Sequence, residues 1–253
     1  KAIFVFDELE RRGIDYDQIA LVDSTVMVKW SCPNFFELTD RKFTVTRDID
    51  NMSWTHDSIQ GYKNIFNDFD LDSTKYFRSG FMVFNETHKN LFQDLKNFYI
   101  KNKRDFIKLQ DEVVRKGNDQ TPINYWVQKN NVELKFLSHA LWMCSHLHRK
   151  EMLSHNWQLN EDKTPFFIKY ANNWMFNGIP KDQRTSLMSQ TWELVKDNYT
   201  LDTTELLLNS VNHKDTFKNA TSRKFKLDLM KYFKDDKYKD MTMVELGCCQ
   251  GDT

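Results

Sequence analysis

The chain has 253 residues and a mass of 30.4 kDa, enough for one large domain or for one domain and part of a second. Its 36 Lys and Arg residues balance its 36 Asp and Glu residues, which excludes a strongly basic nucleic-acid-binding surface and an acidic tail. With 7 Gly and 4 Pro, a turn-rich β-sandwich and a disordered chain are also excluded. Aromatic residues make up 14% of the chain and supply rings for a large core and for a binding site.

Cysteine spacing and hydropathy indicate the compartment. No apolar run approaches the roughly 18 residues that a membrane span needs. The four cysteines (Cys32, Cys144, Cys248 and Cys249) have no C-x-x-C spacing, so neither a zinc ribbon nor a disulfide framework is indicated. We expect a reduced, cytoplasmic setting with no membrane span and no nucleic-acid partner. The chain starts at Lys1 without a signal peptide, and we expect a fragment that is open at both ends.

Helices and strands are predicted to alternate along the chain. Periodicity, caps and short apolar runs predict a helix over 2–12, strands over 19–22 and 43–46, a helix over 58–66, a strand over 81–84, helices over 88–101, 105–116 and 121–129, strands over 132–137 and 166–170, a helix over 182–198 and a strand over 243–246. This alternation predicts an α/β fold with a largely parallel sheet. The polar, Lys-rich stretch 201–239 predicts a helical connector.

The strand over 19–22 ends in an acidic residue, Asp23, which is followed by Ser24 and Thr25. A carboxylate after a buried strand lies at the edge of the sheet where open α/β folds bind ligands. Such a carboxylate can hold a divalent cation that neutralises a diphosphate. An Asp that caps the following turn explains the same pattern equally well.

Two further segments carry candidate site residues. Ser79 and Gly80 precede the strand over 81–84, and a small pair there lets the backbone approach a ligand closely. A tight turn or a bulge is the alternative. Asp119 and Gln120 stand where a loop meets a helix, a position at which the helix dipole favours a carboxylate. A plain N-cap would explain Asp119 but would leave Gln120 without a structural role.

The fourth segment, 173–181, is predicted to be a polar-aromatic loop with Asn177, Gly178 and Lys181. Loops of this composition bind sugar faces and phosphates. In their order and spacing, the four segments resemble a GT-A-type glycosyltransferase, and they are similar to the glycogenin-like and nucleotide-sugar transferase families, including proteins of phage and marine viruses. The resemblance covers about residues 1–199. It implies a Rossmann-like GT-A fold, with a mixed sheet flanked by helices and with the first nucleotide-binding unit missing.

The resemblance also implies an activity and a site. The chain would transfer a sugar from a nucleotide-diphospho-sugar to a hydroxyl acceptor, such as a glycan. The donor-binding residues would be Asp23, Ser24, Thr25, Ser79, Gly80, Asn177, Gly178 and Lys181. Asp119 and Gln120 would be catalytic, with Asp119 as the general base of an inverting reaction or as the group that stabilises the oxocarbenium-like centre of a retaining one. Asp23 would be the metal ligand for Mn²⁺ or Mg²⁺.

Two positions depart from the family's pattern. In the family, the first strand ends in a D-x-D motif that holds the cation, and Thr25 stands in place of its second Asp. Met175 stands where the family has a metal-binding His. Both are poor ligands for a hard cation, so we expect the cation to be held weakly. The alternative is a degenerate, non-catalytic GT-A module that binds a glycan or a nucleotide sugar.

The last segment resembles motif I of SAM-dependent methyltransferases. Glu245, Gly247 and Gly251 follow the strand over 243–246, and the glycines would let the loop pass close to the cofactor. We therefore expect a GT-A-like domain over 1–199, a helical linker over 200–239 and the start of a methyltransferase-like domain over 240–253. SAM would bind only with the remainder of that domain. A third interpretation makes the chain an accessory region of such a methyltransferase. We expect the last strand to be disordered or packed on the first domain.

Overall fold

The computed structural model describes residues 2–49, 51–145, 171–177, 179–199 and 243–244. The chain forms two compact units, which are described separately: Lys1–Asp23, Asn34–Met143 and Thr242–Cys248 make up the first, and Ser24–Pro33, Cys144–Met241 and Cys249–Thr253 make up the second. The strand predicted over 166–170, the linker over 200–239, Gly178 and the glycine loop after Val244 lie outside the described residues. Within the described ranges, no helix is long and apolar enough to cross a membrane.

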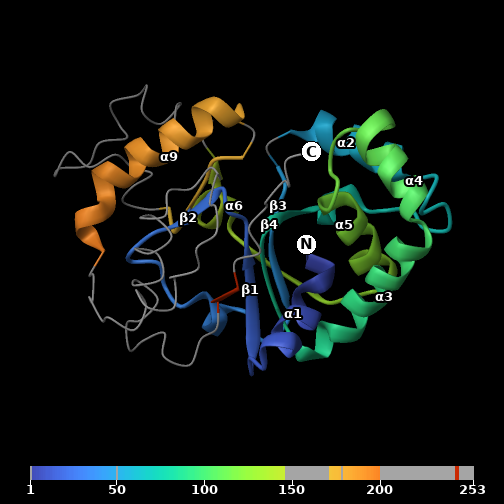
Figure 1. Ribbon diagram of the computed structural model, residues 1–253, viewed down its shortest axis with the longest axis horizontal. Helices are drawn as coiled ribbons and strands as arrows, with labels where there is room; N and C mark the ends of the chain where they lie inside the picture. The colour runs from blue at the N-terminus through green and yellow to red at the C-terminus, as the bar shows by residue number, and fades with distance from the viewer. Residues whose placement is uncertain (1, 50, 146–170, 178, 200–242, 245–253) are drawn as a thin grey trace. The chain divides into compact units, whose positions relative to one another are not determined.

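The first unit contains most of the described helices and strands (Figure 1). In chain order they are η1 (Ala2–Phe4), α1 (Val5–Arg12), β1 (Gln18–Val22), η2 (Phe35–Leu38), β3 (Phe43–Arg47), α2 (Met52–Tyr62), η3 (Ser73–Lys75), β4 (Phe77–Asn85), η4 (Glu86–His88), α3 (Lys89–Lys101), α4 (Lys103–Lys108), the π-helical turn η5 (Leu109–Val113), α5 (Gln120–Lys129), β5 (Leu134–Leu137), α6 (His139–Trp142) and β8 (Met243–Val244). In the second unit they are β2 (Val26–Val28), β6 (Cys144–Ser145), β7 (Asn173–Met175), α9 (Lys181–Val195) and η7 (Lys196–Asn198).

The first unit is built on a mixed sheet with the strand order β5-β3-β4-β1-β8. β4 runs antiparallel to both β1 and β3, whereas β5 and β8 run parallel to their neighbours. The expected mixed sheet flanked by helices is therefore confirmed, but the prediction of a largely parallel sheet is wrong. The reason is that a strand buried on both faces has the same continuous apolar pattern in either direction, so the pattern does not report direction.

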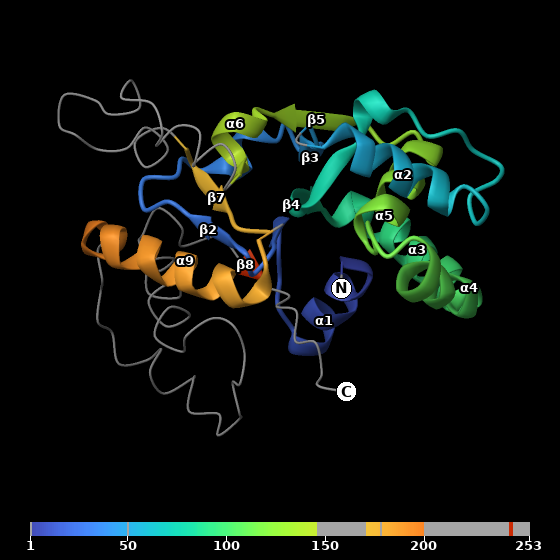
Figure 2. The same cartoon turned by 90° about the horizontal axis from the view of Figure 1, so that it is seen from above.

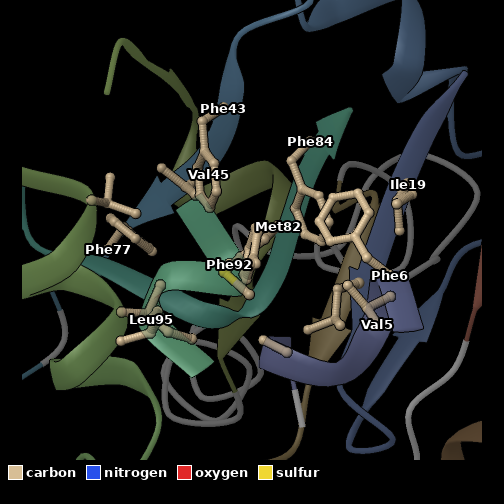
Figure 3. Packing of buried hydrophobic residues seen from close by; sticks show 14 of the residues in the cluster. Val5, Phe6, Ile19, Phe43, Val45, Phe77, Met82, Phe84, Phe92 and Leu95 are labelled. Carbon is tan, nitrogen blue, oxygen red and sulfur yellow. The ribbon is translucent and has the colours of Figure 1, made fainter. Parts of the chain in front are cut away.

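The main core of this unit lies between the sheet and α1, α3 and α5, which cover one face of it (Figures 1 and 2). Figure 3 shows Phe6 of α1, Phe43 of β3, Phe84 of β4 and Phe92 of α3 gathered in this layer. The ring centroid of Phe84 lies 4.6 Å from that of Phe92 and 5.7 Å from those of Phe6 and Phe43. Aromatic pairs at these separations add stabilisation to the burial of their apolar surface.

A bulge interrupts β4 where it carries two of the predicted site residues. On β3, Val45 pairs with Met82, but the next pair joins Arg47 to Phe77, so β4 has extra residues between the two pairs. Phe77 and Met82 lie in the same core cluster, although residues an odd number apart point to opposite faces of a regular strand. The bulge removes this conflict, and it contains Ser79–Gly80. The bulge that the sequence allowed at this pair is thus present.

The boundaries or the type of several helices differ from the prediction, and two cases have a clear description. α2 starts at Met52 rather than at residue 58, because the side chain of Asn51 accepts a hydrogen bond from the backbone N–H of Trp54 at 2.9 Å and caps the helix. The helix expected over 105–116 is instead α4 followed by the π-helical turn η5. Gly13 ends α1 in the left-handed conformation, with φ of 61°, as the sequence predicted.

The second unit contains a sheet with the order β2-β7-β6, in which β7 is antiparallel to β2 and parallel to β6. The prediction of a loop over 173–181 is wrong for its first three residues, which form β7. All three are buried, and Trp174 packs in a cluster with Met188 and Trp192 of α9. The Tyr199 hydroxyl donates a hydrogen bond to the Val28 carbonyl at 2.8 Å and ties the end of η7 to β2.

Of the strand predicted over 243–246, the described residues form β8 (Met243–Val244), which pairs in parallel with β1. Met243 pairs with Ala20 and Val244 with Leu21. This agrees with the expectation that the strand packs on the first unit. The predicted division into three domains stays a prediction.

Candidate functional site

The end of β1 lies against the bulge of β4. The backbone N–H of Asp23 donates a hydrogen bond to the Gly80 carbonyl at 2.9 Å. A Cβ at Gly80 would stand 3.7 Å from the Cβ of Asp23 and 3.3 Å from Cε of Met143, so a glycine allows this close packing. The structure therefore brings together two of the predicted donor-binding segments, although they are far apart in sequence.

Gln120, the first residue of α5, ties this bulge to the end of β3. Its Oε1 accepts a hydrogen bond from the Ser79 backbone N–H at 3.3 Å, and its Nε2 donates to Oδ2 of Asp48 at 2.8 Å. Asp48 directly follows β3 and forms an ion pair with Arg78, with 3.0 Å between Oδ1 and Nη2. The side chains of Arg78 and Asp48 are 11% and 6% exposed, so water screens this pair little. We call these three side chains the Asp48–Arg78–Gln120 network.

Asn124 continues the attachment of α5 to β4 one turn further along the helix. Its side-chain amide accepts a hydrogen bond from the Phe77 N–H at 2.9 Å and donates one to the Phe77 carbonyl at 2.8 Å. Residues at positions i and i+4 share one face of a helix, so Gln120 and Asn124 both face the strand. Asn124 is fully buried. The start of α5 is therefore held in register with the bulge by side-chain hydrogen bonds to its backbone.

The loop before α5 depends on Gly117. Its φ is +62°, and a Cβ there would lie 2.2 Å from Oγ of Ser58 and 2.3 Å from Oγ1 of Thr121. These two hydroxyls share a hydrogen bond of 2.6 Å, and the Thr121 hydroxyl shares another, of 2.7 Å, with that of Tyr76. Burial raises the pKa of the Tyr76 hydroxyl to about 12, so it stays protonated at neutral pH. The glycine and this chain of hydroxyls fix where α5 begins.

Asp119 occupies the N-cap position of α5 without acting as a cap. Its backbone is in the right-handed helical region, and its side chain makes no capping hydrogen bond with any residue that the structure describes. The N-cap explanation of Asp119 is therefore wrong, because a capping side chain accepts a bond from the first turn of its helix. Gln120, for which the sequence offered no structural role, has one in the network. Asp119 is exposed and faces a cavity of about 330 Å³.

The residues after Asp23 belong to the second unit, where Thr25 meets the predicted segment 173–181. The Thr25 carbonyl accepts a hydrogen bond from the Phe176 N–H at 2.8 Å, and Val26 pairs with Met175. Thr25 and Ser24 are partly buried, as is Asn177, whereas Lys181 is exposed at the start of α9.

The described residues offer few ligands for a metal ion. Among the residues that the structure describes, no three His, Cys, Asp or Glu side chains are grouped so that they could hold a metal ion. Asp23 offers a carboxylate, and Oγ1 of Thr25 is buried without a hydrogen-bond partner within the same described part of the chain. Oxygen ligands suit Mn²⁺ or Mg²⁺, but one carboxylate, that of Asp23, supplies fewer ligands than either ion needs. A cation therefore fits only if a bound diphosphate supplies further oxygen ligands.

Sequence reasoning missed Asp48 and Arg78. Asp48 follows a buried strand closely, which is the same signal that selected Asp23, and Arg78 directly precedes the Ser79–Gly80 pair. A larger hollow, of about 850 Å³, lies along α9, and the lining residues within the described ranges all come from that helix. Comparisons of the chain with protein-family models, with curated proteins and with solved structures find no match.

Proposed function

We propose that the chain is a GT-A-type glycosyltransferase that moves a sugar from a nucleotide-diphospho-sugar to a hydroxyl acceptor. One observation carries the proposal: Asp23, Ser79–Gly80 and Gln120 come from three distant segments and lie in one hydrogen-bonded neighbourhood around the bulge of β4. These are three of the four segments on which the family resemblance rests. Pairing of β1 with β4 brings Asp23 to Gly80, and Gln120 adds a third predicted site residue to the same place.

Each of these residues has a role in the proposal. Asp23 binds the donor at the diphosphate, and a cation, when bound, neutralises the charge of the leaving diphosphate. The bulge at Ser79–Gly80 lets the backbone approach the sugar. Gln120 acts as a positioning residue, because both ends of its amide are engaged by Ser79 and Asp48. Asp119 is exposed and serves as the general base, or as the group that stabilises an oxocarbenium-like centre.

Release of nucleotide from a panel of nucleotide-diphospho-sugars with Mn²⁺ tests this assignment. Asp23→Asn and Asp119→Asn should each lower the rate of release by about a hundredfold or more, since each removes a carboxylate that acts on the reacting groups. Asp94→Asn is the matched control, because Asp94 is an exposed residue of α3 with no proposed role. Equal rates in all four proteins, with each variant folded by circular dichroism, would contradict the assignment.

A second candidate is a non-catalytic module that binds a nucleotide sugar or a glycan. Met175 favours it, because this residue is 2% exposed and packs within the second unit in place of a metal-binding His. Donor binding in calorimetry without nucleotide release from any donor would support this candidate. The third interpretation, an accessory region of a methyltransferase, depends on Glu245, Gly247 and Gly251, which lie outside the described residues.

A further inference from the structure

We propose that the cavity beside Asp119 binds the apolar body of the acceptor, and that the acceptor is an aromatic or aliphatic alcohol whose hydroxyl reaches the Asp119 carboxylate. The role as acceptor rests on the proposed function, whereas binding in the cavity does not. The cavity lies within the first unit, between η1, α3, the α4–η5 segment and the start of α5.

The size and the walls of the cavity suit a small apolar ligand. Its volume of about 330 Å³ is at the lower end of the range for small-molecule sites. The apolar and aromatic side chains in the wall include Ile3, Phe4, Leu95, Tyr99, Phe106 and Ile123. Phe106 is fully buried and Phe4 is 46% exposed, so the cavity runs from the core of the unit to solvent. A ligand with one or two rings would bury most of its surface there.

The polar groups of the wall select the head group of the ligand. Asp119 is the one charged side chain among the described residues that line the cavity. The amide Nε2 of Gln110 donates to the Asn118 carbonyl at 2.6 Å, so this donor is engaged within the protein. The wall therefore favours a ligand that donates a hydrogen bond to a carboxylate and disfavours an anion. A hydroxyl on an apolar body fits this wall.

The same walls disfavour a free sugar as the acceptor. A saccharide carries hydroxyls around its whole ring, and each one that loses water against an apolar wall without a new hydrogen bond weakens binding. An alcohol with a single hydroxyl avoids this cost, because its one polar group meets Asp119.

In the proposed reaction, the sugar is transferred from the diphosphate of the donor to the hydroxyl of the acceptor. The hydroxyl oxygen of the acceptor forms a bond to the anomeric carbon of the donor sugar, and the bond between that carbon and the diphosphate oxygen breaks. The diphosphate leaves with the electron pair of the broken bond, and the hydroxyl proton passes to the Asp119 carboxylate. The apolar walls would place the alcohol next to its base before the reaction.

Equilibrium binding of 2-naphthol and naphthalene to the full chain tests the cavity. Both should bind, and 2-naphthol should bind about tenfold more tightly because its hydroxyl donates to a carboxylate. Asp119→Asn should reduce this preference and leave naphthalene binding unchanged. Ile3→Trp should block both probes by filling the cavity, whereas Ile100→Trp, at an exposed position outside the wall, should block neither.

Three results would overturn the proposal. Absence of binding, or binding that Ile3→Trp leaves intact, would remove the cavity as the site while leaving donor-dependent nucleotide release untouched. Binding of 2-naphthol that fails to raise nucleotide release from any active donor would remove its role as acceptor. If both probes bind as expected but no donor releases nucleotide, the proposed function fails and the cavity stands as an apolar ligand site.

Discussion

Arg78→Met is expected to lower the free energy of unfolding by about 3–5 kcal/mol, because it leaves the Asp48 carboxylate buried without its ion-pair partner. The two side chains lie 3.0 Å apart and are 11% and 6% exposed, so water cannot replace the lost guanidinium easily. Gln120 would remain as a hydrogen-bond donor to Asp48, but it carries no charge to balance the carboxylate. Urea denaturation of the two proteins measures the loss.

The double variant Arg78→Met with Asp48→Asn shows how much of the lost stability comes from the unpaired charge and how much from lost packing. It removes both charges and keeps a polar group for Gln120, so it should recover part of the lost stability. Nucleotide release by Arg78→Met should fall even where the variant is still folded, because the bulge at Ser79–Gly80 loses one of its attachments. A loss below about 1 kcal/mol, the range of exposed ion pairs, would show that the pair behaves as a surface contact.

Gly117→Ala is expected to destabilise the chain by about 2–5 kcal/mol. A left-handed backbone costs an alanine about 1–2 kcal/mol, and a side chain forced into a filled space costs about 1–3 kcal/mol more. The added Cβ would stand 2.2 Å from the Ser58 hydroxyl and 2.3 Å from that of Thr121, so both must move and their buried hydrogen bonds must break.

Gly13→Ala is the matched control for this prediction. Gly13 has nearly the same φ, +61°, but no atom lies within 4 Å of a Cβ built there. Its substitution should therefore lower the free energy of unfolding only by the cost of a left-handed backbone for alanine, about 1–2 kcal/mol. Thermal or urea denaturation of both variants gives the comparison. Equal losses would show that the crowding around Gly117 relaxes without cost and that α5 does not depend on it.

Local patterns predicted the elements whose determinants are local. The continuous apolar run before Asp23 gave β1, Gly13 gave the end of α1, and helical spacing gave α3 within one residue of its start. The direction of β4 had no such signal, because it is decided by which neighbours the strand meets in the sheet. The strands of the second unit, such as β7, are three residues or shorter, and periodicity does not identify strands of that length.

Part of the candidate site was predictable, because some of its residues have a local signal in the sequence. Asp23 and the Ser79–Gly80 pair were selected because each has a local signal next to a buried strand. Gln120 was selected as well, but its hydrogen bond to Asp48 and the ion pair between Asp48 and Arg78 were not predicted, because no local pattern relates positions so far apart in sequence. Asn124 belongs to the same class, since its two bonds to Phe77 depend on how α5 docks against β4.

Calorimetric titration of Mn²⁺ into the full chain, alone and with a nucleotide diphosphate, is the most direct test of a donor site at Asp23. Because the protein offers few oxygen ligands, Mn²⁺ should bind weakly alone and about tenfold or more tightly with the nucleotide, whose phosphates supply the rest. Asp23→Asn should abolish this gain, and Thr25→Asp should raise the affinity for Mn²⁺ alone. Tight Mn²⁺ binding without nucleotide, or the same affinity with and without it, would contradict a diphosphate site at this position.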